Sequence, residues 1–162
     1  MVSMVKLAGG LAFGAVLSQF PEYSQQYVQR MGGALDELTT VVADFDISAK
    51  ASGHTRDQAL TAMTGSDFLI ARQSDMTHTF IRFETLFADY SYLKDANAYQ
   101  RLTYVARMRD VEVAKGTAKD FKPAVPLTTD GFGAAGIGFL LGYGLLAGLL
   151  RIFRRSRKRI AA

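Results

Sequence analysis

The residue types best suited to metal or acid–base chemistry are the two histidines, because the chain has no cysteine. Asp75 precedes His78 by three residues, so the two side chains would share one face of a helix. One carboxylate and one imidazole do not complete a metal site, which needs three or four ligands. The spacing favours a surface ion pair at His78, and we expect His54 to lie in a loop without a specific role.

Paired carboxylates are the second candidate for chemistry. They occur at Asp36 and Glu37 and at Asp44 and Asp46, which is the spacing of a solvated helix surface. Acid–base catalysis needs a cleft that drives two pKa values apart, and nothing in the sequence indicates one. The chain also lacks the sequence motifs of phosphate loops, dinucleotide folds, nucleophile elbows and zinc helices. The sequence therefore predicts a protein that is not an enzyme and carries no cofactor.

Charge is distributed unevenly along the chain, and this distribution marks the parts that would position such side chains. Residues 22–130 hold all fifteen acidic residues and twelve of the nineteen basic ones. Six more basic residues crowd the last twelve positions, so the net charge of +4 describes a mildly acidic domain with a basic tail. Because no basic surface is spread over the domain, the composition argues against nucleic acid as a partner.

Two apolar segments flank the acidic region. Residues 131–150 contain no charge and seven glycines, and 20 helical residues cover roughly the 30 Å core of a bilayer. The N-terminal segment is shorter, with residues 7–21 uncharged, and spans only if Lys6 snorkels toward the headgroups. A signal peptide is the competing interpretation of this segment, although an Ala-x-Ala cleavage site is absent.

The basic tail predicts the orientation of both segments. Lys and Arg next to a span mark its cytoplasmic side, so we expect a bacterial inner-membrane protein with both termini cytoplasmic and the central domain periplasmic. We also expect the tail to bind anionic lipid headgroups on that face. The tail residues concerned are Arg154, Arg155, Arg157, Lys158 and Arg159.

Small residues recur at helical spacing in both segments, which lets another backbone approach closely. The positions are Gly10, Gly14, Ala134, Gly138, Gly142, Gly144 and Gly148. The sequence leaves three packing partners open: the other span, a second copy of the chain, or a different protein.

The region between the spans is predicted to be helical. Residues from Tyr27 to Phe45 and from Met76 to Tyr90 place apolar side chains at alternating spacings of three and four, which indicates an antiparallel helical hairpin. Phe83 and Phe87 are expected in its core, and Asp89 on its exposed polar face. Thr55 with Gln58 fits a capping box that starts a short helix between the two rods.

Tyrosines and prolines mark the remaining candidate positions. Tyr90, Tyr92 and Tyr99 cluster where the long helix ends, and we expect them to bind a partner.

Prolines interrupt helices, so rigid elbows are predicted where the domain meets each span. The elbow residues are Pro21, Phe121, Pro123 and Pro126, and Thr128 or Thr129 would cap the second membrane helix.

Two stretches of the chain resemble a proteobacterial family, the domain-of-unknown-function family 2937. The first is SQFPEYSQQYVQRMGGALDEL at 18–38, and the second is DFKPAVPLTTDGFGAAGIGFLLGY at 120–143. They match its QFPE-like turn and its FxPAxPLTxxG motif, whereas residues 50–115 do not match clearly. The resemblance implies an inner-membrane protein with two spans, and it transfers no activity, cofactor or catalytic residue.

These observations predict an all-α membrane protein with two transmembrane helices flanking a periplasmic helical hairpin. Its expected parts are the first span at 1–20, the domain at 21–127, the second span at 128–153 and the tail at 154–162. The expected function is that of a non-catalytic accessory or scaffold subunit of an inner-membrane complex, for instance a respiratory or photosynthetic one. A membrane-organising homo-oligomer and, less favoured, a periplasmic sensor or binding module are the alternatives.

Overall fold

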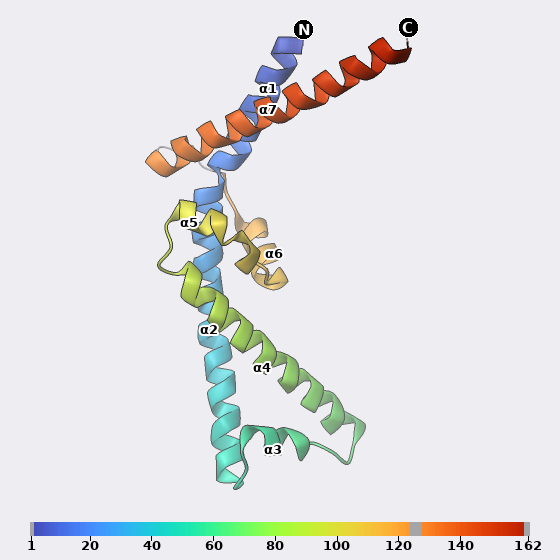
Figure 1. Cartoon of the computed structure of the whole chain (residues 1–162). Helices are drawn as coiled ribbons and strands as arrows, with labels where there is room; N and C mark the ends of the chain where they lie inside the picture. Colours follow the sequence, from blue (N-terminus) through green and yellow to red (C-terminus); the bar gives the residue numbers. More distant parts are fainter. Residues whose placement is uncertain (1, 124–127, 161–162) are drawn as a thin grey trace. The chain divides into compact units, whose positions relative to one another are not determined.

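A computed structural model of the chain describes residues 2–123 and 128–160, with side chains for residues 4–123 and 128–152. All of its regular elements in this described part are helical, which confirms the predicted all-α class. In order, they are α1 (Val2–Ser18), α2 (Phe20–Ala51), α3 (Arg56–Thr61), α4 (Asp67–Leu93), α5 (Ala98–Thr103), the 3-10 turn η1 (Val105–Arg107), α6 (Val111–Asp120) and α7 (Thr129–Ile160) (Figure 1).

Contacts divide the chain into two compact units. The span unit comprises Met1–Gln25, Asn97–Thr103 and Asp120–Ala162, and the hairpin unit comprises Gln26–Ala96 and Tyr104–Lys119. The sequence predicted a linear order of parts instead, with residues 21–127 as one domain. Helix α5 accounts for much of the difference, because it packs with the spans although the chain on both sides of it belongs to the hairpin unit.

The hairpin unit is built on α2 and α4, which run in opposite directions and are connected through α3 (Figure 1). Tyr27 and Met31 lie in its main core, as their spacing predicted. A second cluster joins Val42 of α2 to Met76 and Phe80 of α4. The main core contains Tyr27, Val28, Met31, Leu35, Leu86, Leu93 and Val113.

The predicted core position of Phe87 is wrong, because its side chain is 58 % exposed. Leu86 occupies the core instead and is almost fully buried. A straight α-helix has 3.6 residues per turn, so a strict three–four repeat drifts around it and one position can leave the core face. Phe83, one turn earlier, is partly buried against the core as expected.

Side-chain caps define where several helices begin. Thr55 and Gln58 form the predicted reciprocal capping box of α3. Ser66 accepts a hydrogen bond from the Leu69 amide at the start of α4. Gly53 and Gly65 adopt positive φ angles of 77° and 96° on either side of α3, a backbone conformation that favours glycine.

Among the described residues, two helical stretches contain a segment long and apolar enough to cross a membrane. The first is Met4–Ala51, which combines α1 and α2 across a turn at Gln19, and the second is Thr129–Ile152 within α7. Thr128 caps α7 by accepting a hydrogen bond of 3.1 Å from the Gly131 amide. Of the two predicted cap residues, Thr128 and Thr129, the cap is therefore Thr128. Asp130 lies in the first turn of α7, where its charge is favourable to the helix dipole.

Candidate functional site

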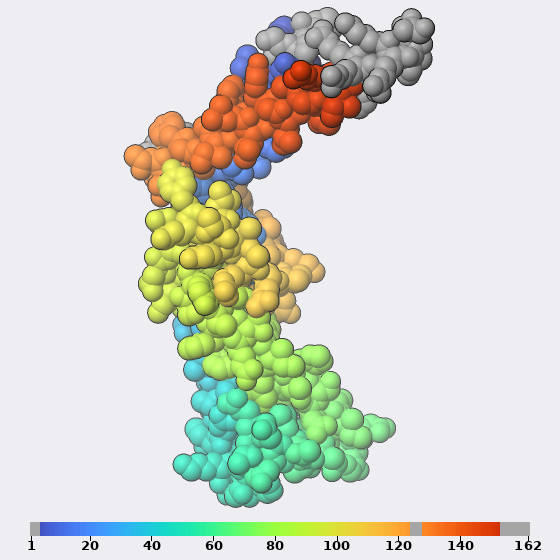
Figure 2. Space-filling view, in the orientation of Figure 1, coloured from blue at the N-terminus to red at the C-terminus, as the bar shows by residue number. Residues whose placement is uncertain are grey.

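The helices α1 and α7 pack directly against each other (Figures 1 and 2). Glycines of both helices lie in this contact. A Cβ atom added to Gly138 would stand 2.6 Å from the carbonyl oxygen of Phe13, and one added to Gly142 would stand 2.8 Å from that of Gly9. On α1, a Cβ at Gly14 would stand 2.8 Å from the carbonyl oxygen of Ala135. These are backbone contacts, so only glycine permits this approach.

Other small residues complete the same contact. A Cβ at Gly10 would stand 2.8 Å from the ring of Phe139, and Ala134 is buried. Of the three packing partners that the sequence left open, the structure therefore assigns the other span to Gly10, Gly14, Gly138 and Gly142.

The second glycine pair of α7 belongs to a different face. A Cβ added at Gly136, Gly144 or Gly148 would meet nothing within 4 Å. Leu140, which lies between them along the helix, is 71 % exposed. At about 100° per residue these positions point away from the side that contacts α1. Within the described residues, this open face of α7 remains without a packing partner.

An aromatic contact joins the regions of the two predicted elbows within the span unit. The ring of Tyr23, which follows Pro21, packs edge-on against Phe121 with centroids 5.8 Å apart. Pro21 lies in the first turn of α2, where its missing N–H costs no hydrogen bond. Phe121 and Pro123 lie beyond the end of α6 without regular structure, and Pro126 falls outside the described residues.

The three candidate tyrosines occupy different environments. Tyr90 is partly buried against the core and against Gly32, whose added Cβ would stand 3.1 Å from its hydroxyl oxygen. Tyr92 is 51 % exposed on the hairpin unit. Tyr99 is also exposed, but its hydroxyl lies against Gly133 at the start of α7 in the span unit. Tyr90 and Tyr92 belong to the hairpin unit and Tyr99 to the span unit, and Tyr92 is the most exposed of the three.

Asp89 is the buried charge that the sequence interpretation missed. Its side chain was expected to be solvated, yet only 2 % of it is exposed. The carboxylate accepts hydrogen bonds from Arg107 Nη1 at 3.1 Å and from Arg109 Nε at 2.7 Å. The two arginines come from η1 and the residues after it, so Asp89 anchors this segment to α4. A buried carboxylate requires such partners, because an unpaired one is costly.

A second network fixes the segment between η1 and α6. Arg82 of α4 donates to Asp110 at 2.9 Å and contacts Glu112 at 2.6 Å. Asp110 in turn accepts from the Val113 amide at 2.8 Å, so it caps α6. The Asp110 amide donates to the hydroxyl of buried Tyr27 at 3.1 Å. Tyr27 therefore serves both the core and this network.

Both Asp110 and Asp46 have lowered pKa values. Burial raises the pKa of Asp110, but hydrogen bonds from Arg82 and the Val113 amide outweigh it, so the net shift is downward. The hydrogen bond from Arg56 lowers the pKa of Asp46, against a smaller opposing effect of burial. Arg56 also stacks on Phe80 at 4.7 Å, and it thereby holds α3 against the other two helices of the hairpin.

These shifts predict that the hairpin unit loses stability in acid. A lowered folded pKa contributes stability that is complete above the unfolded value, near 4, and that disappears as the pH falls through the folded value. We expect the Tm of the protein in nanodiscs to fall steadily below about pH 4, measured by circular dichroism. Asp110→Asn should lower the Tm at pH 7 and flatten this dependence. An unchanged slope in that variant would contradict the assignment.

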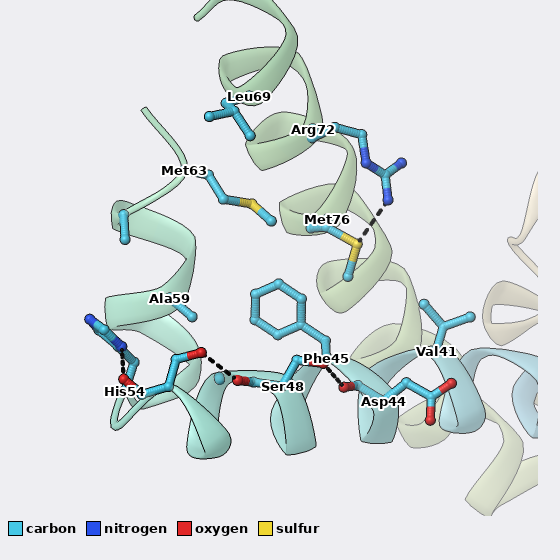
Figure 3. A pocket seen from close by; sticks show the side chains of 13 residues that line it. Val41, Asp44, Phe45, Ser48, His54, Ala59, Met63, Leu69, Arg72 and Met76 are labelled. Atoms are coloured by element: carbon cyan, nitrogen blue, oxygen red, sulfur yellow. Dashed lines mark hydrogen bonds between the residues drawn. The ribbon is translucent and has the colours of Figure 1, made fainter. Parts of the chain in front are cut away.

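An open pocket of about 590 Å³ lies among the end of α2, α3 and the start of α4 (Figure 3). The side chains of Met63 and Met76 point toward the ring of Phe45, and the walls are largely apolar. The hydroxyls of Ser48 and Ser52 donate to carbonyl oxygens one turn earlier, at 2.9 and 3.0 Å. The volume suits a small apolar molecule, but the lining groups do not converge on a particular chemistry.

The histidines and carboxylates are the remaining candidates for chemistry. Within the described residues, no group of three or more His, Asp or Glu side chains could hold a metal ion. His54 lies in the loop before α3, where its Nδ1 is 2.7 Å from the carbonyl oxygen of Ser52 and donates to it. The side chains of the five tail residues at 154–159 fall outside the described part.

Comparisons with known proteins give one match. A family model described as "Protein of unknown function (DUF2937)" matches residues 1–159. No curated protein and no solved structure matches the chain.

Proposed function

We propose that this chain, which belongs to the DUF2937 family, is a non-catalytic accessory or scaffold subunit of a bacterial inner-membrane protein complex. The observation that carries the proposal is the open glycine face of α7, formed by Gly136, Gly144 and Gly148. Two other glycines of α7, Gly138 and Gly142, are already used against α1. A second surface that admits a closely packed helix supports assembly with a further membrane helix.

The proposed orientation keeps both termini in the cytoplasm and the hairpin unit in the periplasm. Six basic residues among the last twelve support it through the positive-inside rule. The tail would bind anionic lipid on the cytoplasmic face, and a respiratory or photosynthetic assembly would be one instance of the complex.

The open face gives the test of this proposal. Leucine at both Gly144 and Gly148 should block approach of a partner helix and leave the α1–α7 contact intact. We expect the partner recovered with the affinity-tagged chain from mild detergent to fall about tenfold or more, measured by quantitative mass spectrometry. Gly33→Leu is the matched control, since Gly33 is an equally open helical glycine outside the spans.

Two results would count against the proposal. If the double variant recovered as much partner as the unsubstituted chain, the open face of α7 would not be the binding surface. Recovery of homo-oligomers alone from native membranes would favour the second candidate, a membrane-organising homo-oligomer, in which the same face meets its symmetry mate.

A further inference from the structure

Four side chains of the hairpin unit form a surface that we call the Arg–Tyr surface: Tyr92, Tyr104, Arg107 and Arg109. Its charge is not balanced. Asp89 carries one negative charge, and the two arginines that bind it carry two positive ones. If the cluster served only to neutralise the buried carboxylate, one arginine would be enough. The second leaves a positive charge at the surface, where Arg109 is 60 % exposed.

The two guanidinium groups are held in place before any partner arrives. Arg107 stacks on the ring of Tyr92 at 3.7 Å, and Tyr92 packs edge-on against Tyr104 with centroids 6.1 Å apart. Arg109 binds Asp89 through both Nε and Nη2. Fixing a binding group in advance reduces the entropy that association must lose. The three hydrogen bonds to Asp89 leave most N–H groups of the two arginines available, since each guanidinium has five.

Acidic groups on the same segment form a separate network with Arg82. Asp110 is bound by Arg82 and by the Val113 amide, and Glu112 is bound by Arg82. That network carries one net negative charge, so the charges of the two networks together sum to zero. What distinguishes Arg107 and Arg109 is therefore the exposure and fixed position of their guanidinium groups, and not a surplus of charge over the region.

We infer that the Arg–Tyr surface binds an acidic protein segment, with Arg107 and Arg109 pairing with its carboxylates and Tyr92 and Tyr104 packing against it. Arginine matches a carboxylate through two parallel hydrogen bonds, and Tyr and Arg are the residue types that dominate binding energy at interfaces. This inference rests on the proposed accessory function, because it names the chemistry of a partner for the hairpin unit.

The test is a titration of the full chain in nanodiscs of neutral lipid with a fluorescent peptide that carries six glutamates. Because the basic tail would also attract the peptide, the reference chain has glutamine at the five tail positions at 154–159. We expect Arg109→Gln to weaken binding about tenfold by fluorescence anisotropy, and Lys50→Gln, which removes an equal charge elsewhere on the hairpin unit, to leave it unchanged. A peptide with six glutamines should not bind.

A second variant separates geometry from charge. Arg109→Lys keeps the charge but loses the two-pronged donor, so affinity should fall nearly as far as in Arg109→Gln. Circular dichroism of both variants checks that the fold is retained. Failure of the peptide to bind the reference chain, or equal loss with Lys50→Gln, would overturn the inference. Either result leaves recovery of the membrane partner unchanged, so it does not bear on the accessory function.

Discussion

Leucine in place of Gly142 is expected to separate α1 from α7. A Cβ at this position would stand 2.6 Å from the Cβ of Phe13 and 2.8 Å from the carbonyl oxygen of Gly9. Backbone cannot move aside as the end of a side chain can, so the helices themselves must part. Overpacking a close contact costs about 1–3 kcal/mol, and occasionally more, when side chains and backbone have to shift.

The absence of native cysteine makes this separation directly measurable. Spin labels on cysteines at Val16 and Leu140, both exposed positions of the two spans, should give a narrow distance distribution in the parent chain. Gly142→Leu should broaden the distribution and lengthen its mean. Gly148→Leu is the control, because a Cβ atom added there has nothing within 4 Å. An unchanged distribution in Gly142→Leu would refute the backbone contact.

The second large effect is expected at Asp89. Asp89→Ala removes the carboxylate that binds Arg107 and Arg109, so the segment after α5 loses its attachment to α4. Removing one partner of a buried ion pair costs about 3–5 kcal/mol when the other stays buried. Both arginines here can reach water, so we expect about 2–3 kcal/mol, measured as the loss in free energy of unfolding of the hairpin unit.

A surface aspartate on the same helix provides the control for Asp89. Asp75 pairs with Arg72 at 3.6 Å and its side chain is well exposed, so Asp75→Ala should change stability by less than about 0.5 kcal/mol. Hydrogen exchange would report the location of the effect, with amides from Tyr104 to Val113 losing protection in Asp89→Ala. If the two variants were equally stable, the buried carboxylate would not be the anchor of this segment.

The local features of this fold could be predicted from the sequence because each depends on a few neighbouring residues. The caps at Thr55 and Thr128 need only a hydroxyl and the next helical turn. The glycines of the spans were recognised by their spacing, but their assignment needed coordinates. Gly142 faces α1 and Gly144 does not, although both have a small residue four positions away.

Asp89 shows why other features could not be predicted. Its binding residues lie 18 and 20 positions later, beyond the end of α4, so no helical repeat connects them to it. One signal was present. Asp89 follows Leu86 by three positions and precedes Leu93 by four, and both leucines are in the core. A charged residue at such a position needs a counter-ion, and that requirement predicts a basic partner for Asp89 without identifying which of the basic residues it is.

The contact between α1 and α7 also orders the events of biosynthesis. Translation proceeds at about 5–20 residues per second, so α7 leaves the ribosome on the order of ten seconds after α1. Throughout that interval Gly10 and Gly14 lack the helix that they contact in the folded chain. The small-residue face of α1 is therefore open to other helices until α7 is made, and a chain truncated before α7 would keep it open.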